Sequence, residues 1–239
     1  MFLVRQKLKK SRKKEREIKE RFLLRLFFAM RRIICGDNAW FGREGVFNTE
    51  DTPNKTWKTN SAKVEFPEGK TWKDYITLKK LEVACGEAPY VASRYDNGTG
   101  KWIEPKDRIG FLDRKLRVVS ENCSDEESWK KNAVISLMNS YALDYQGDNV
   151  LLARENLLSD VKEWYSYIWN SEPDDKFSLQ CAVVISWNVF QCDFIKGTFP
   201  NFSKNSEKKL KKSKDVLYYE KDEQRCLLMD WKTRTQITF

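Results

Sequence analysis

The stretch "YQGDNVLLARENLLSDVKEWYSYIW", residues 145–169, decides the fold because it reads as one long amphipathic helix. Gly147 is expected to end the preceding helix, and Asp148 or Asn149 to cap the new one by accepting backbone N–H bonds. The apolar residues of the stretch recur at helical spacing and form one stripe: Val150, Leu151, Leu157, Leu158, Val161, Trp164, Tyr165 and Ile168.

Arg154 lies near the edge of this stripe. The residues that end one helix and cap the next do not account for its position. A partly buried arginine needs a partner for its charge. Glu155, or an acid from the preceding half of the chain, would supply a structural ion pair. The alternative is that Arg154 contacts a ligand or a partner molecule.

Helical patterns flank this stretch, and strand patterns precede them. Residues 124–143 begin with a helix N-cap and an acidic first turn, and residues 177–195 form a third apolar helical segment. Upstream, Asn97-Gly98 is a hairpin turn signal, and "IGFLDRKLRVVS", residues 109–120, reads as a strand. The sequence therefore predicts an α+β protein: a mixed β-rich N-terminal half followed by a helical half, with a basic N-terminal helical arm.

The same patterns predict the boundaries between the parts of the chain. We expect a basic helical arm at 1–32, an α+β domain at 33–200, a polar linker at 201–222 and a C-terminal strand pair at 223–239. Within the α+β domain, residues 33–120 are expected to be β-rich and residues 121–200 helical.

The net charge of +9 is concentrated in the arm. Residues 1–32 hold thirteen Lys or Arg against three Glu, which leaves the rest of the chain close to neutral. Such a run is either a solvated tail or a segment that binds nucleic-acid phosphates. On the second interpretation, the DNA-binding side chains are those of the densest part of the run: Lys9, Lys10, Arg12, Lys13, Lys14 and Arg16.

Composition excludes several classes of protein. The chain has no histidine, which removes Ser-His-Asp and Cys-His triads and most zinc enzymes. The apolar run at 22–30 is too short for a membrane span and carries Arg25, and a signal peptide fits it poorly. We therefore expect a soluble, cytoplasmic protein without a membrane partner, whose six scattered cysteines are reduced.

One short pattern suggests a nuclease. Asp113 and Lys115, with Asp96 and Glu104 upstream, resemble the acids and lysine that hold Mg²⁺ in metal-dependent nucleases. The alternative is that these residues form an exposed, charged face of a strand and have no catalytic role. The nine tryptophans could stack on bases, but most of them, including Trp187 in an apolar helix, are expected in the core.

Several longer phrases resemble a family of bacterial proteins known as restriction endonuclease subunit M, which are restriction–modification DNA methyltransferases or their relatives. The phrases keep the family's order and cover most of residues 42–239: "GREGVFNTEDTPNKTWKTNSAKVEFPEGKTWKDYI", "LEVACGEAPYVASRYD", "RIGFLDRKLRVVSEN", "YQGDNVLLARENLL", "ISWNVFQCD" and "CLLMDWKTRTQITF". The resemblance implies site-specific DNA modification, with S-adenosylmethionine as the methyl donor in intact members.

The chain departs from the family in the motifs that perform catalysis. It has no Pro-Pro dipeptide to hold a flipped adenine, and its single G-x-G, at 98–100, belongs to the expected hairpin. We therefore expect no cofactor in the isolated chain and a possible partner chain that carries the missing motifs. By the resemblance, Asp37 would follow a cofactor-side strand and contact the adenine of the cofactor.

These observations favour a component or fragment of a methyltransferase that serves DNA recognition or assembly rather than catalysis. The alternatives are a complete but divergent S-adenosylmethionine-dependent DNA methyltransferase, an Mg²⁺-dependent nuclease that uses Asp113 and Lys115, and a degenerate fragment without activity.

Overall fold

A computed structural model of the protein describes residues 36–51, 56–96, 99–200 and 225–238, and it confirms an α+β fold. Residues 36–41 are helical and precede the first strand. The later elements are β1 (Asn48–Asp51), β2 (Thr56–Thr59), α2 (Trp72–Ile76), β3 (Lys80–Val83), a 3₁₀ turn (Pro105–Asp107), α3 (Phe111–Asn122), α4 (Glu126–Met138), β4 (Ser140–Asp144), α5 (Gly147–Trp169), α6 (Asp175–Asn188), β5 (Val189–Gln191), β6 (Leu227–Asp230) and β7 (Thr235–Thr238).

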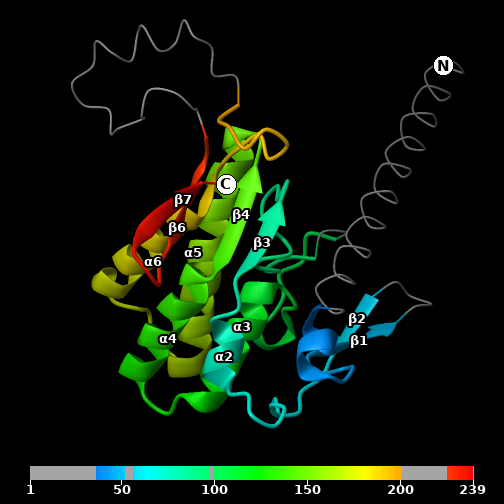
Figure 1. The fold of residues 1–239 in the computed structure, drawn as a ribbon. Coiled ribbons are helices and arrows are strands. Elements are labelled where there is room, and N and C mark those ends of the chain that lie inside the picture. The colour runs from blue at the N-terminus through cyan, green and yellow to red at the C-terminus, as the bar shows by residue number, and fades with distance from the viewer. Residues whose placement is uncertain (1–35, 52–55, 97–98, 201–224, 239) are drawn as a thin grey trace, which may run out of the picture.

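The centre of the fold is a parallel sheet in the order β3-β4-β5 (Figure 1). Lys80 pairs with Ser140, and Ala142 pairs with Val189. The connection from β3 to β4 contains α3 and α4, and the connection from β4 to β5 contains α5 and α6. Parallel strands need such long crossovers, and the helices of each crossover connect two neighbouring strands of the sheet.

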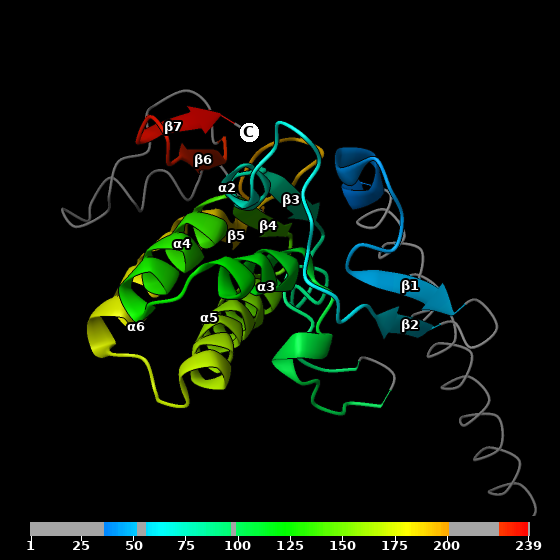
Figure 2. The same cartoon turned by 90° about the horizontal axis from the view of Figure 1, so that it is seen from below.

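The two faces of the sheet are covered by different elements, as Figure 2 shows. On one face, Ala142 and Val189 join the large core formed with α3, α4, α5 and α6. On the other face, Leu143 and Phe190 pack with Leu228 of the β6–β7 hairpin. The sheet is therefore a middle layer between the helices and the hairpin.

Residues 111–122 form helix α3, so the predicted strand at 109–120 is wrong. Leu112, Leu116 and Val119 are fully buried at helical spacing. The charged residues between them conceal the helical period in the sequence, because a charged residue is expected to be exposed. Asp113 and Lys115 are instead fully buried. The interpretation of residues 33–120 as uniformly β-rich is corrected accordingly.

The predicted helix at 124–143 also contains a strand. α4 ends at Met138, and Ser140 to Asp144 form β4, whose five residues are all buried. A strand this short, buried on both faces, has no alternating pattern that would separate it from a helix.

The start of α5 differs from the sequence prediction. Gly147 is the first residue of the helix, the N-cap is Gln146, and no side chain caps the end. Asp148 and Asn149 therefore lie inside the first turn, and the prediction of a cap by either of them is wrong. The carboxylate of Asp144 holds this turn instead, because it accepts hydrogen bonds from the Gln146 backbone N–H and the Asn149 side chain.

Arg154 has a structural partner, but the partner is not an acid. Its guanidinium donates to the carbonyl oxygens of Val189, at 2.8 Å, and Ser186, at 3.1 Å, where α6 ends. A cation beside the last carbonyls of a helix satisfies acceptors that have no partner within the helix. Arg154 thus fastens α5 to the end of α6.

Two smaller expectations are confirmed, and others lie outside the described residues. β6 and β7 form the C-terminal strand pair, and Tyr95 and Trp102 form an antiparallel bridge beside the predicted hairpin turn. The basic arm at 1–32 and the linker at 201–222 fall outside the described residues. The five described cysteines are free thiols. Among the described helices, none combines the length and the apolar character needed to cross a membrane.

Arg154→Ala should lower the free energy of unfolding by about 1–3 kcal/mol, because it removes a donor from the carbonyl of the buried Val189. Asp148→Ala, at an exposed position without a capping bond, should change it by no more than about 0.5 kcal/mol. Urea unfolding followed by circular dichroism measures both. An equal decrease in the free energy of unfolding for the two variants would contradict the conclusion that Arg154 links α5 to the end of α6.

Candidate functional site

The strongest candidate site lies at the carboxyl edge of the parallel sheet. β3, β4 and β5 run in the same direction, so the loops that follow Val83, Asp144 and Gln191 gather at one edge (Figure 1). In open α/β sheets, ligands bind in the crevice outside the carboxyl ends of the strands. This edge is therefore where the fold itself favours a binding site.

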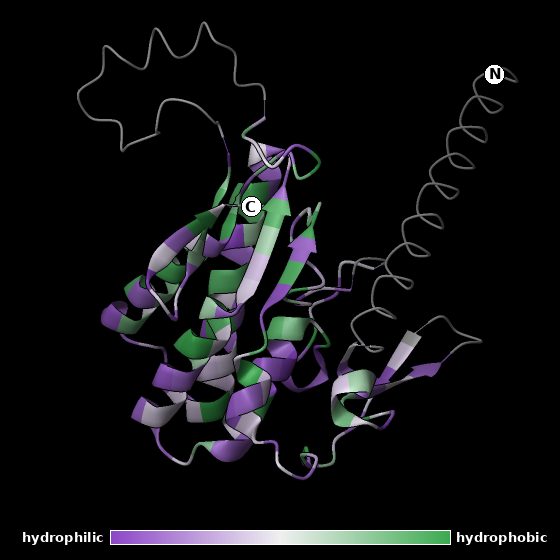
Figure 3. Ribbon diagram, viewed as in Figure 1, coloured by the Kyte–Doolittle hydropathy of each residue, from purple (hydrophilic) through white to green (hydrophobic). Residues whose placement is uncertain are grey.

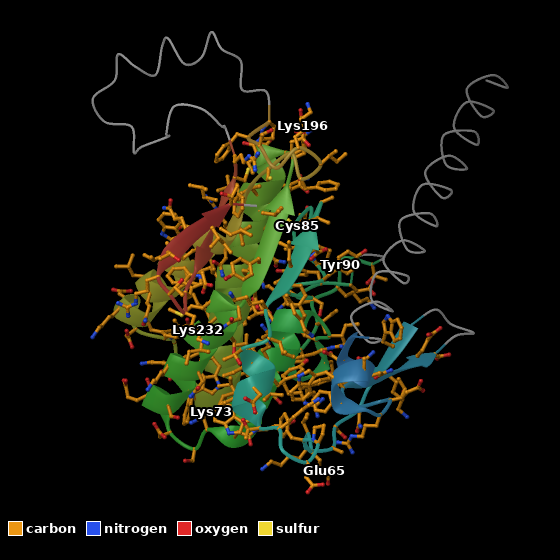
Figure 4. All side chains as sticks on the ribbon, in the orientation of Figure 1. Glu65, Lys73, Cys85, Tyr90, Lys196 and Lys232 are labelled. Carbon is orange, nitrogen blue, oxygen red and sulfur yellow. The ribbon has the colours of Figure 1, made fainter. Side chains whose placement is uncertain are left out.

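The loop after β3 has an unusual backbone. Ala84, Gly86 and Ala88 all have positive φ angles, of 53°, 58° and 59°. The left-handed conformation costs roughly 1–2 kcal/mol for a residue with a Cβ, and such residues cluster at functional sites. Cys85, labelled in Figure 4, lies just past the carboxyl end of β3. Residues 84–88 thus place their backbone at the edge of the sheet. Loops that bind ligands through close backbone contacts have the same kind of conformation.

Asp144, the last residue of β4, organises the edge. Its carboxylate accepts hydrogen bonds from the backbone N–H of Gly86 and the backbone N–H of Gln146, both at 2.8 Å, and from the Asn149 amide at 3.1 Å. The side chain is only 6% exposed, although Tyr145 and the residues up to Asp148 are exposed. One buried carboxylate thus joins the loops that follow two neighbouring strands.

Glu82 contributes a second carboxylate beside the first. It pairs in register with Ala142, and its Oε2 atom is buried without a hydrogen-bond partner among the described residues. Burial, with the negative charge of Asp144, raises the pKa of Glu82 well above its usual value. A buried carboxyl without a full set of partners has capacity left for a ligand. The edge can therefore accept hydrogen bonds from hydroxyl or ammonium groups.

The structure places Asp37 away from this edge. It lies in the helical segment 36–41 and pairs with Lys80, the first residue of β3, at 2.6 Å, and with Arg114. Burial alone would raise the pKa of Asp37, but Arg114 and Lys80 together hold it below its usual value. Asp37 therefore fixes the amino end of β3 to α3, and its contact with a cofactor stays a prediction.

Asp113 and Lys115 do not form the strand-borne pair that a nuclease site requires. On α3, Asp113 accepts from Ser93, Gly110 and Trp164. Lys115 donates to the carbonyl oxygens of Leu78 and Asn139. In the part of the chain that the structure describes, no group of three or more Cys, Asp or Glu residues could hold a metal ion.

The remaining candidate residues are placed as follows. The six basic residues from Lys9 to Arg16 lie outside the described ranges. Trp129 and Trp164 are core residues, as expected for most tryptophans, whereas Trp187 is 38% exposed in contrast to its predicted burial. Trp102 is 45% exposed.

Sequence reasoning missed Glu82 and Asp144. Each stands in a short apolar strand and is followed by a glycine within a few residues, in "LEVACGE" and "ALDYQGD". This repeated pattern of strand, acid and glycine was the available signal, and it differs from the G-x-G loop that is typical of cofactor-binding motifs.

Comparisons of the chain with protein-family models, with curated proteins and with solved structures found no match.

Glu82→Gln should stabilise the protein at neutral and alkaline pH. A carboxyl whose pKa is raised on folding contributes its stability below the unfolded pKa of 4.5 and loses it as the pH rises through the folded pKa. The amide does not ionise, so the variant should exceed the wild type by roughly 1–3 kcal/mol at about pH 8 and show a flatter pH dependence.

Chemical unfolding at a series of pH values tests this, with Glu87→Gln, in the exposed part of the same loop, as the control. A parallel pH dependence of the wild type and Glu82→Gln would show that Glu82 ionises as freely in the fold as in the unfolded chain.

Proposed function

We propose that the chain is a component of a bacterial restriction–modification DNA methyltransferase that serves DNA recognition or assembly rather than catalysis. Within that complex, the carboxyl edge of its sheet forms one wall of the S-adenosylmethionine site. The observation that carries the proposal is a pair of carboxylates beside the left-handed loop at that edge: the buried Asp144, and the partly buried Glu82 with its buried Oε2 atom.

The residues of the edge fit the chemistry of this cofactor. S-adenosylmethionine offers ribose hydroxyls and an α-ammonium group, which donate hydrogen bonds to carboxylates. The loop of residues 84–88 provides backbone in place of bulky side chains at the same edge. The resemblance of "LEVACGEAPYVASRYD" and "YQGDNVLLARENLL" to the methyltransferase family covers these same segments.

A partner chain is part of the proposal, and the open side of β3 supports it. β3 pairs with β4 alone among the described strands. Leu81 and Val83 alternate with charged neighbours along β3 (Figure 3), and each is 43% exposed. In doubly wound sheets the first strand has neighbours on both sides, because the second half of the sheet begins beside it. The partner would supply that half together with the missing catalytic motifs.

S-adenosylmethionine should bind the isolated chain weakly, with a dissociation constant no tighter than about 100 μM, because one wall of the site is missing. Glu82→Gln should remove the binding while the chain stays folded, and Glu87→Gln should leave it unchanged. Isothermal titration calorimetry measures both.

Two results of this titration would contradict the proposal. One is the absence of binding at millimolar cofactor, and the other is binding that Glu82→Gln does not alter. Binding as tight as about 1 μM would instead show a complete site, and would overturn the requirement for a partner chain.

DNA binding should be weak, salt-sensitive and dependent on residues 1–32, because thirteen basic residues lie in that arm. Each neutralised phosphate releases counterions, so the logarithm of affinity should fall linearly with the logarithm of salt concentration. Fluorescence anisotropy with a labelled duplex compares the whole chain with a chain that lacks residues 1–32.

Residues 208–214, "KKLKKSK", form another basic run, and neutral substitutions of its lysines provide the control. Unchanged affinity after removal of the arm would contradict a DNA-binding role for Lys9, Lys10, Arg12, Lys13, Lys14 and Arg16.

A further inference from the structure

A second polar site lies on the side of α5, away from the sheet edge. It is a cleft of about 460 Å³ between the later turns of α5 and residues 94–105. Its position along α5, around Lys162, is about 20 Å from Asn149 at the sheet edge, given a rise of 1.5 Å per residue. The residues that line it include Trp102, Glu104, Lys162, Glu163, Tyr167 and Glu172.

The floor of the cleft is a network of ion pairs. Glu163 pairs with both Arg94 and Arg108, and Arg108 also pairs with Asp160 at 2.7 Å. The Trp102 indole N–H donates to Glu163 at 3.4 Å, and the Arg108 guanidinium lies 5.3 Å from the Trp102 ring centroid. These contacts hold Trp102 in place. The charges of Arg94 and Arg108 are neutralised by carboxylates of the protein itself.

The groups left toward solvent have a different character. Among the described residues, no ion-pair or hydrogen-bond partner contacts the carboxylate of Glu104, and Glu172 accepts only a 3.5 Å hydrogen bond from Ser166. Trp102 and Tyr167 are 45% and 46% exposed. The cleft therefore combines two available carboxylates with two half-exposed aromatic rings over a fixed floor.

We propose that this cleft binds an arginine side chain of a protein partner. A guanidinium group is planar, so it stacks on aromatic rings, and its N–H groups pair with carboxylates in two directions at once. Lys162, at the rim, can donate to a carbonyl oxygen of the same partner segment. Nucleic acid fits less well, because the available carboxylates of Glu104 and Glu172 repel phosphates. This activity goes beyond the proposed methyltransferase function and does not depend on it.

The test uses the full chain labelled with 5-fluorotryptophan and a blocked tripeptide, Gly-Arg-Gly. Fluorine NMR should show that the peptide shifts the resonance that is missing from Trp102→Phe. The same peptide with citrulline in place of arginine should bind at least about fivefold more weakly, since it keeps the shape and lacks the charge. Glu104→Gln and Glu172→Gln should weaken binding by a similar factor. Glu155→Gln, at an exposed position on α5 outside the cleft, should not.

Three outcomes would overturn the proposal. The first is no shift of the Trp102 resonance at millimolar arginine peptide. The second is equal binding of the citrulline peptide. The third is a larger shift with a thymidine oligonucleotide than with the arginine peptide, which would identify the aromatic rings as a surface for bases. Because Glu104 and Glu172 are exposed, their variants should fold, and the amide spectrum of each verifies this.

Discussion

The carboxylate of Asp113 is the interaction on which the rest of the molecule depends. It is fully buried, and it accepts hydrogen bonds from the backbone and hydroxyl of Ser93, from the backbone of Gly110 and from the indole of Trp164. These donors belong to the segment after β3, the N-cap of α3 and the later turns of α5. A buried carboxyl group with this many donors has its hydrogen-bonding capacity filled, and the loss of any donor leaves an acceptor unpaired in an apolar environment. Gly110 completes the junction, because an added Cβ would lie 2.4 Å from the Val91 carbonyl oxygen.

The same junction shows why the sequence predicted only part of the fold. α5 and the β6–β7 hairpin follow regular patterns, a stripe in one case and two short strands around a turn in the other, so they could be predicted. α3 could not, because Asp113, Arg114 and Lys115 look like a solvated run and are instead buried by partners far away in the sequence. Local periodicity carries no information about such partners. The strands of the parallel sheet have three to five residues, which is too short for a reliable period.

The candidate site depends on register in the same way. Glu82 and Asp144 are single acids in unrelated segments, and only the pairing of β3 with β4 brings them to one edge. Asp37, which the family resemblance singled out, belongs to the opposite end of β3 through its pair with Lys80. Acidic residues near a strand can thus stabilise the fold or remain available for a ligand, and their hydrogen-bond partners decide which. Asp37 has both carboxylate oxygens paired, whereas one buried oxygen of Glu82 has no partner within the part of the chain that the structure describes.

The parallel sheet also has a consequence for how the chain folds. Lys80 pairs with Ser140 and Ala142 with Val189, so every pairing within this parallel sheet joins residues that are tens of positions apart. Closing such long loops costs entropy before any strand pairing compensates for it, and proteins rich in distant contacts fold slowly. The helical hairpins α3–α4 and α5–α6 contain the local contacts and can form earlier. β4 is complete only when both crossovers have closed, so until then its buried apolar residues lack a neighbouring strand on at least one side, and a high concentration of newly made chains favours aggregation through this strand.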